Sequence, residues 1–279
     1  MLAPDMVIHL IDGTYELFRH FYGRKRGGVD RKLGAASGVL HTVLETLEQG
    51  GTHVGVATDH VVESFRNGIW PGYKTGAGID PSLRLQFVPL EQALHAMGVL
   101  VWPMVEFEAD DALAAAAAFA AADQAVDQVR IWTPDKDLAQ CVSENRVVQV
   151  DRRAGIVRDA DGVREKFRVD PPRIPDLLAL VGDSADGYPG IPGIGMVGAA
   201  RLINEHGPIE SFPEAVLGER RELALLFKDL ATLRSDMEVL ADVEQLRWRG
   251  PTPEFAAWVG QLGDDRLLGR CESVAKTRS

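Results

Sequence analysis

The sequence predicts an α/β protein with a mostly parallel sheet flanked by helices, followed by a helical region. Short runs of apolar, β-prone residues alternate with stretches of helical spacing, and an acidic residue follows closely after each run. Such alternation is typical of a parallel sheet, whose ligands bind outside the carboxyl ends of the strands. The four runs are residues 6–11, 53–58, 99–104 and 129–133.

The first run illustrates the pattern. Residues 6–11 are apolar or β-prone and end at Asp12-Gly13, as expected of a buried strand that stops at a functional loop. Between the runs, apolar residues recur three or four positions apart, which is typical of helices packed on a sheet. These helical stretches are 14–22, 39–47, 91–97 and an alanine-rich one from Glu108 to about 122.

The remaining segments suggest a loop, a hairpin and a second, helical part. Residues 67–78 are glycine-rich and too long for a simple connection, so we expect a mobile loop or lid. Residues 146–151 and 155–158 suggest a short hairpin. Pro171-Pro172 then marks a shift to helical sequence, with helices at 174–181, 197–206 and 220–233. We therefore expect one domain over residues 1–170 and a second over 171–279.

Composition excludes several classes of protein. With 46% hydrophobic residues among 279, the chain is expected to be globular. Two cysteines, Cys141 and Cys271, lie far apart without metal-ligand spacing, which argues against a disulfide framework and a zinc site and favours a cytoplasmic protein. The longest apolar stretch, residues 112–122, is too short to span a bilayer.

Nine carboxylates lie in five short islands where a strand should end or a helix begin. Any single island has an ordinary explanation, because acids are common in first helical turns, caps and tight turns. A shared sheet edge makes one pocket more probable than five coincidences. The residues are Asp12; Asp59; Glu108, Asp110 and Asp111; Asp135 and Asp137; and Asp183 and Asp186.

Such a pocket predicts a two-metal site. Like charges repel, so gathered carboxylates stay ionised only if cations fill the pocket. Oxygen ligands favour Mg²⁺ or Mn²⁺, and two such ions could clamp both the attacking water and the leaving oxygen of a phosphodiester. The formal charge of −11 is compatible with nucleic acid, because removing the nine acids from 41 leaves 32 against 30 Lys and Arg.

A glycine-rich turn from Gly190 to Gly195 is the most specific signal in the second half. Its glycines permit close backbone approach, and the helix that follows offers free N–H groups to a phosphate. A merely tight turn between two helices is the alternative. The residues expected to meet DNA are Gly190, Ile191, Gly193, Ile194 and Gly195.

These residues resemble a known family, the 5′ nucleases of the flap-endonuclease type. The family includes standalone bacterial 5′ to 3′ exonucleases and the amino-terminal nuclease domain of bacterial DNA polymerase I. The resemblance runs from about residue 7 to residue 240. It rests on Leu10-Ile-Asp-Gly13, Ser64-Phe-Arg66, Tyr73-Lys74, Glu108-Ala-Asp-Asp111, Asp135-Lys-Asp-Leu138, Gly182-Asp-Ser-Ala-Asp186 and Pro189-Gly-Ile-Pro-Gly-Ile-Gly195.

The resemblance implies a PIN-like nuclease domain, a helix-three-turn-helix (helix-hairpin-helix) DNA-binding region and hydrolysis near the 5′ ends of flapped, nicked or primer-bearing duplexes. All nine acids fall on family metal-ligand or supporting positions, and Asp12, Asp111 and Asp135 are expected to be catalytic. Lys74 would reach the scissile phosphate, Tyr73 would stack on a base, and Arg66 would steer the strand. The turn at Gly190 to Gly195 would also bind K⁺. A monomer is expected.

Two departures from the family pattern affect DNA contacts. Ala77 stands where an arginine is usual, and Met196-Val197 offers no charge after the glycine turn. Burial of the Tyr73 ring, as an anchor for its loop, is the alternative to base stacking. Two other functions remain open, namely a DNA-junction binding protein with weak or no turnover and a structure-specific ribonuclease.

Overall fold

A six-stranded sheet forms the centre of the computed structural model, which describes residues 6–24 and 32–278. The strand order is β3-β2-β1-β4-β5-β6, and every neighbouring pair is parallel except β5 and β6. The strands are β1 (Val7–Asp12), β2 (His53–Asp59), β3 (Leu100–Met104), β4 (Gln128–Trp132), β5 (Val147–Asp151) and β6 (Ile156–Arg158). This confirms the predicted fold class and the predicted hairpin.

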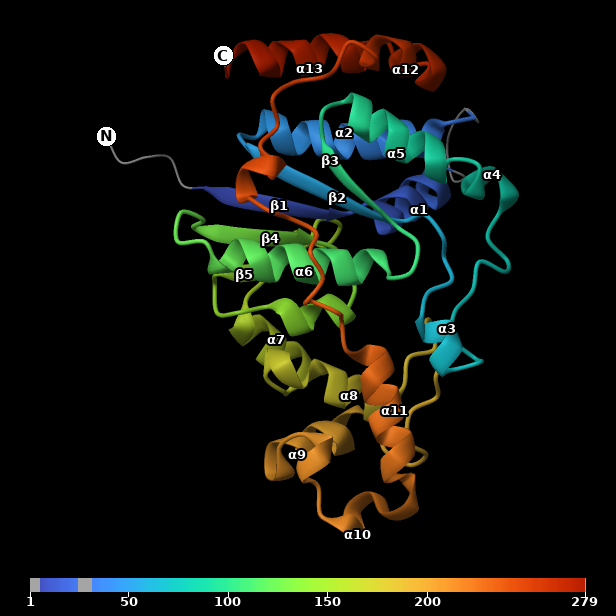
Figure 1. The fold of residues 1–279 in the computed structure, drawn as a ribbon. Coiled ribbons are helices and arrows are strands. Elements are labelled where there is room, and N and C mark those ends of the chain that lie inside the picture. The colour runs from blue at the N-terminus through green and yellow to red at the C-terminus, as the bar shows by residue number, and fades with distance from the viewer. Residues whose placement is uncertain (1–5, 25–31, 279) are drawn as a thin grey trace.

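Helices cover both faces of the sheet (Figure 1). The central strands are nearly continuous runs of buried Val, Ile and Leu, as parallel strands covered on both sides should be. Leu40, Val43 and Leu44 of α2 pack in the core on one face, and the alanines of α6 pack on the other. The helices are α1 (Gly13–Arg24), α2 (Gly34–Glu48), α3 (Arg66–Ile69), α4 (Pro81–Arg84), α5 (Phe87–Ala96) and α6 (Ala109–Ala122).

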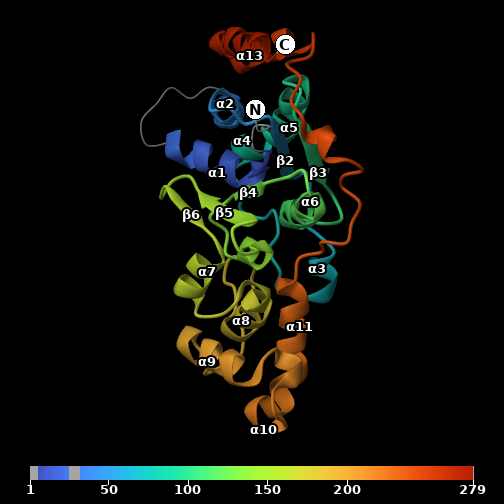
Figure 2. The ribbon, with the colours of Figure 1, turned by 90° about the vertical axis from the view of Figure 1, so that its left-hand side faces the viewer.

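A separate lobe of helices extends below the sheet (Figures 1 and 2). It has its own core, which includes Leu177 of α8, Ile203 of α9 and Phe227 of α11. Pro175 opens α8, where a missing N–H is tolerated, and Gly182 ends it with a φ of 88°. The helices are α7 (Ala160–Phe167), α8 (Ile174–Val181), α9 (Met196–His206), α10 (Glu214–Leu217) and α11 (Arg221–Ala231).

After α11 the chain returns to the sheet. An extended segment passes α6, and two further helices, α12 (Phe255–Leu262) and α13 (Arg266–Lys276), pack on α2 and α5 at the top of the molecule in Figure 1. The sequence pattern gave no sign of these two helices or of α7. Residues beyond about 250 thus lie against the sheet domain rather than in the helical lobe.

The glycine-rich segment after α3 is held in place by side chains. Asn67 Nδ2 donates to the carbonyl oxygens of Tyr73 and Lys74 at 3.4 and 3.0 Å, and Trp70 Nε1 donates to the Gly187 carbonyl at 3.0 Å. The predicted mobile loop is therefore tied to the lobe over its first half. Among the described residues, no helix is long and apolar enough to cross a membrane.

Gly13 allows the start of α1 to lie against the end of β2. A Cβ at this position would sit 2.7 Å from Val56 Cγ1 and 2.8 Å from the Ala57 carbonyl oxygen. Gly13→Ala should therefore lower the free energy of unfolding by about 1–3 kcal/mol, as overpacking does in cores. Urea unfolding measures the loss. Gly23→Ala, which would meet nothing within 4 Å, is the control, and equal stability of the two variants would contradict the prediction.

Candidate metal centre

The carboxyl ends of β1 and β2 bring two buried aspartates to one edge of the sheet. Asp12 Oδ1 accepts a hydrogen bond from the Tyr15 N–H at 2.8 Å, and its Oδ2 accepts one from Thr133 Oγ1 at 3.0 Å. Asp59 Oδ1 accepts one from the Ala109 N–H at 2.8 Å. These bonds come from the first turns of helices and from the end of β4, so the local fold fixes both carboxylates.

Asp12, Asp59, Asp110 and Asp135 act electrostatically as one group. Burial and the charges of Asp59 and Asp135, opposed in part by the hydrogen bonds from Tyr15 and Thr133, together raise the pKa of Asp12 to about 7. Burial and the charges of Asp135 and Asp12 raise the pKa of Asp110 well above its usual range. The charges of Asp59 and Asp135 therefore oppose the ionisation of both Asp12 and Asp110 unless a cation offsets them.

Asp137, Asp183 and Asp186 form a second carboxylate group. One oxygen from each lies within 4.8 Å of the others, and all three residues are buried. Asp137 Oδ1 is buried without a hydrogen-bond partner in the described part of the chain. Burial and the charges of Asp135 and Asp186 raise the Asp137 pKa well above its usual range. A buried, unpartnered carboxylate oxygen is costly, and a cation would satisfy it.

Lys74 connects the two sides of the centre. Its Nζ lies 2.9 Å from Glu108 Oε2 and 3.0 Å from Asp186 Oδ1, and its side chain is 30% exposed. Although burial opposes the charged form, Glu108 and Asp186 raise the Lys74 pKa well above its ordinary value. The Lys74 N–H donates to the Asp186 carbonyl at 2.9 Å, which aligns the backbone here. Lys74 is thus a fixed, permanently charged cation at the mouth of the centre.

Lys136 is a second cation at the centre that sequence reasoning missed. Its Nζ donates to Asp183 Oδ2 and lies 3.9 Å from Asp137 Oδ1. Its position between Asp135 and Asp137 in the sequence was the signal that could have found it. Two lysines therefore offset part of the negative charge, and the donor set that remains is made of carboxylate oxygens, which suits Mg²⁺ or Mn²⁺.

Asp111 does not join either carboxylate group. Its oxygens accept two bonds of 2.7 Å from the Arg66 guanidinium, one of 2.9 Å from the Glu108 N–H and one of 2.8 Å from the Arg234 N–H. All four lone-pair directions are used, and the residue is fully buried. Both Asp111 oxygens are thus taken by protein donors, which favours a structural role, and the catalytic and metal-binding role expected from the sequence stays a prediction.

Arg66 and Tyr73 both lie inside the protein, and their predicted DNA contacts stay predictions. Arg66 is 1% exposed and, besides Asp111, donates from Nε to the Leu230 carbonyl at 2.8 Å and from Nη2 to the Thr232 carbonyl at 3.2 Å. Tyr73 is 3% exposed, and its hydroxyl donates to Glu108 Oε2 at 3.3 Å. Both side chains contact acids of the centre from inside the protein. The Tyr73 ring is buried, as expected if it anchors its loop, which was the alternative to base stacking.

Glu108 is more a support than a free ligand. Its Oε1 accepts from Ser64 Oγ at 2.6 Å, and its Oε2 accepts from Tyr73 and Lys74. Glu108 thereby holds the lysine that also contacts Asp186.

The glycine turn joins α8 to α9 in the helical lobe. Gly190, with a φ of 71°, packs so closely on Gly182 that a Cβ would lie 2.4 Å from the Gly182 nitrogen. Ile191 is buried and its N–H donates to the Leu180 carbonyl at 2.8 Å, while Gly193 and Gly195 are exposed. The exposed glycines lead directly into the first turn of α9, where N–H groups are unpaired within the helix. Arg220, which sequence reasoning also missed, donates from Nη1 to the Pro192 carbonyl at 3.0 Å.

Both parts of the chain match one family of nucleases. Residues 7–168 match the 5′–3′ exonuclease N-terminal resolvase-like domain, and residues 169–254 match the 5′–3′ exonuclease C-terminal SAM fold. Both domains of this family are thus present, and both contribute carboxylates to the centre. The chain belongs to the 5′–3′ exonuclease family, which confirms the resemblance seen in the sequence.

Individual relatives agree with this assignment. DNA polymerase I of Pseudomonas aeruginosa is 34% identical over 260 aligned positions, and the match covers 85% of this chain and 28% of that protein. A 5′–3′ exonuclease of Aquifex aeolicus is 29% identical, and the match covers 88% of this chain and 87% of that protein. The chain spans only 26–33% of the length of the polymerases it matches.

Solved structures show the same fold. A T5 5′-exonuclease with bound zinc ions has a TM-score of 0.67 at 15% identity, covering 98% of this chain and 100% of that chain. The catalytic core of Rad2 in complex with a DNA substrate has a TM-score of 0.62 at 15% identity, covering 98% and 92%. Bound divalent metal and DNA thus occur in proteins of this fold.

Removing the Asp111 carboxylate should unfold rather than merely inactivate the protein. Asp111→Ala leaves the buried Arg66 guanidinium without its partner, and breaking a buried pair typically costs about 3–5 kcal/mol. Asp135→Ala should lower the free energy of unfolding only slightly, because among the described residues Asp135 Oδ1 accepts a single hydrogen bond, from the Asp137 N–H. Chemical denaturation of both variants tests the contrast. Equal, small losses would show that Asp111 carries no structural charge pair.

Without a cation, the protein should become less stable as the pH rises. Folded Asp12 holds its proton to about pH 7 and the pKa of Asp110 is raised well above its ordinary range, whereas an unfolded aspartate ionises near 3.8. Between the unfolded and folded pKa values, each such group therefore lowers the free energy of unfolding by at most about 1.4 kcal/mol per pH unit. Urea unfolding in EDTA from pH 4.5 to 7 measures this loss, because these two aspartates outweigh the opposite contribution of His9, whose pKa burial lowers to about 4.

Mn²⁺ should abolish that pH dependence by binding the ionised carboxylates. Asp110→Asn should flatten the EDTA profile. If the free energy of unfolding of the parent protein in EDTA did not change with pH, the inferred repulsion among the carboxylates would be contradicted.

Proposed function

We propose that this chain is a Mg²⁺- or Mn²⁺-dependent 5′ to 3′ exonuclease and flap endonuclease that hydrolyses phosphodiester bonds near the 5′ ends of flapped, nicked or primer-bearing DNA duplexes. One observation carries the proposal: Lys74 Nζ lies 2.9 Å from Glu108 Oε2 and 3.0 Å from Asp186 Oδ1, beside three buried carboxylates that could hold a cation. Such a centre offers cation ligands and a positive charge for a phosphate at the same place.

The residues divide into two candidate metal sites. Asp12, Asp59, Asp110 and Asp135 would hold one ion, and the second group, Asp137, Asp183 and Asp186, would hold the other. When bound, two divalent ions lower the pKa of a water and neutralise charge on the phosphate. Lys74 would position the scissile phosphate through its ammonium group, which its raised pKa keeps charged at neutral pH. Lys136 would counter the charge of Asp183.

The helical lobe would hold the duplex. Gly193 and Gly195 are exposed ahead of α9, so backbone N–H groups there could bind a phosphate without reading bases. The neighbouring carbonyl oxygens could take K⁺. On this proposal, residues 1–170 are mainly the nuclease domain and residues 171–279 supply the DNA-binding lobe, the last two helices excepted. The protein would act as a monomer in the cytoplasm, where both cysteines stay free.

A DNA-junction binding protein with weak turnover is the second candidate. Val197 is 85% exposed and Met196 40% exposed at the start of α9, and neither side chain carries a charge for a phosphate. Ala77 is likewise exposed and uncharged. These positions favour reduced DNA affinity, although the carboxylates of the centre are intact.

Cleavage of a 5′-labelled DNA flap duplex in Mg²⁺ or Mn²⁺ tests the proposal. We expect cuts near the junction that vanish in EDTA and in Asp135→Asn, because a neutral amide cannot replace an ionised ligand. Lys74→Met should slow cleavage by about 10²–10³-fold, the usual effect of removing one donor to the reacting group. Asp161→Asn, an exposed carboxylate on α7, is the matched control and should cut at the parental rate.

The two candidates give opposite results in this assay. A gel shift on the same flap without cleavage in either metal would favour the junction-binding protein. Cleavage of an all-RNA stem in preference to the DNA flap would instead favour a ribonuclease.

A further inference from the structure

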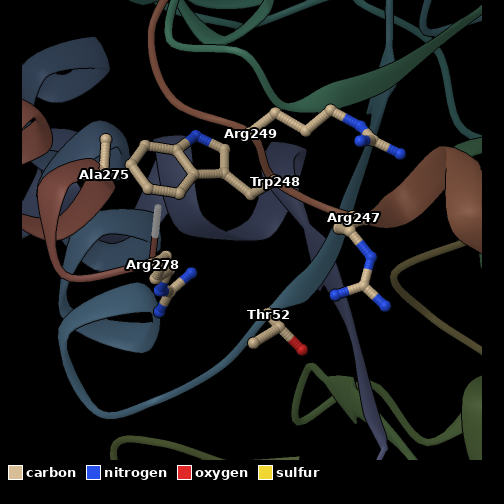
Figure 3. Close-up of a pocket in the computed structure, with 6 residues that line it drawn as sticks. All are labelled: Thr52, Arg247, Trp248, Arg249, Ala275 and Arg278. Atoms are coloured by element: carbon tan, nitrogen blue, oxygen red, sulfur yellow. The ribbon is translucent and has the colours of Figure 1, made fainter.

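A basic pocket lies at the opposite end of the sheet from the carboxylates. Thr52 lines it directly before β2, whose other end is Asp59, so a seven-residue strand separates the two sites by roughly 20 Å. The pocket has a volume of about 420 Å³. It is lined by Thr52, Arg247, Trp248, Arg249, Ala275 and Arg278 (Figure 3).

Arg278 is held in this pocket with an unused donor. Its guanidinium carbon lies 5.5 Å from the centre of the Trp248 ring, and its Nη2 donates to the Leu47 carbonyl. Its Nη1 is buried and has no hydrogen-bond partner anywhere in residues 6–24 and 32–278. A buried guanidinium N–H without an acceptor is costly, so a small shift of the Arg278 guanidinium toward an anion in the pocket would relieve a cost that the fold otherwise bears.

The pocket also carries an excess of positive charge. Three arginines line it and no acid does; Glu244, just outside, pairs with Arg247 at 2.6 and 2.8 Å. Arg249 is 75% exposed, and its contact with Glu244 is 3.9 Å long. One carboxylate against three guanidinium groups leaves a net charge of +2. This excess is notable in a chain whose formal charge is −11.

The side chains surround a space rather than each other. Figure 3 shows the Arg278 and Arg247 guanidinium groups on opposite sides of the pocket, with Thr52 between them and the Trp248 ring above, while Arg249 extends outward. The Trp248 ring is fixed, because its Nε1 donates to the Met97 carbonyl at 2.8 Å and the residue is 4% exposed. The Trp248 side of the pocket is therefore in place before a ligand binds.

We propose that this pocket binds a phosphomonoester of nucleotide size, independently of the carboxylate centre. A phosphomonoester carries close to two negative charges at neutral pH, which matches the local excess, whereas a backbone phosphodiester carries one. Guanidinium groups suit its oxygens because they form paired hydrogen bonds. The volume exceeds what inorganic phosphate needs, so the rest of a nucleotide fits as well. The phosphate could belong to a free nucleotide or to the 5′ end of a DNA strand.

Calorimetric titration of the purified full chain tests the proposal. EDTA is present throughout, so that a cation at the carboxylate centre cannot recruit the ligand. The probes are inorganic phosphate, dAMP and, as an anion of single charge, acetate. We expect one dAMP per chain, weaker binding of phosphate at the same pocket, no binding of acetate, and weaker binding at higher salt.

Variants locate the site. Arg278→Met should raise the Kd for dAMP at least about tenfold, the effect of losing a desolvated charge-assisted bond. Arg249→Gln should raise it more modestly, and this exposed residue can be replaced without disturbing the fold. If Arg278→Met fails to fold, Arg278→Lys and Arg249→Gln decide the matter. Arg266→Gln, on the exposed start of α13 and outside the pocket, is the matched control and should bind as the parent does.

A second arm separates the two sources of phosphate. Oligonucleotides with a 5′-phosphate or a 5′-hydroxyl are compared in EDTA with the same variants. A preference for the 5′-phosphate that disappears in Arg278→Met assigns the pocket to a DNA end, and equal binding of both with tight dAMP binding assigns it to a free nucleotide. No binding of phosphate or dAMP, or binding that the Arg278 and Arg249 variants leave unchanged, would overturn the proposal. Because no arm measures cleavage, failure of the proposed nuclease would not affect it.

Discussion

Repulsion among carboxylates at one edge of the sheet is the constraint on which the rest of this structure depends. Parallel strands β1 and β2 deliver Asp12 and Asp59 to the same edge, and the start of α6 and the segments after β4 and α8 add the others. Burial and neighbouring charges raise several of their pKa values, so these carboxylates oppose one another's ionisation. Two lysines and helix N–H groups offset part of this repulsion, while Asp137 Oδ1 has no hydrogen-bond partner among the described residues. A divalent cation bound by these carboxylates would offset the rest.

A buried ion pair next to that centre contributes to stability instead. The Arg66–Asp111 pair is buried, doubly hydrogen-bonded and extended by the carbonyl groups of Leu230 and Thr232. A guanidinium fork meets a carboxylate here, with four of its five N–H donors in hydrogen bonds and a further contact at 3.5 Å to Glu108 Oε1, and such satisfaction is the condition under which a buried pair is tolerated. Two neighbouring acids in the sequence, Asp110 and Asp111, therefore have different tasks. One faces the carboxylate centre and the other faces the interior, because adjacent positions on a helix point about 100° apart.

The sequence was sufficient for the sheet and for the grouping of the acids, because strand ends and helix starts follow from local periodicity. Which carboxylate faces a cation could not be predicted, since the answer depends on a partner such as Arg66 that lies 45 residues away from Asp111. Tyr73 is a similar case, because its burial follows from packing against the helical lobe. Helices α12 and α13 were missed because their anchoring contacts come from α2 and α5. Helix α7 was missed because it is short and mostly polar, with Ala160, Val163 and Phe167 as its buried residues. The role of Lys136 was not predicted, because the acids on either side of it in the sequence were taken as the functional residues.

The path of the chain has a mechanical consequence. The helical lobe is an excursion: the chain leaves the sheet after β6, and it returns through the extended segment that follows α11 (Figure 2). Arg66, which precedes that excursion, donates to carbonyl groups at its far end. A body attached at both ends and clamped by a side chain has no single pivot and cannot swing as a flap on one hinge does. The distance between the glycine turn and the carboxylates is therefore fixed by the fold.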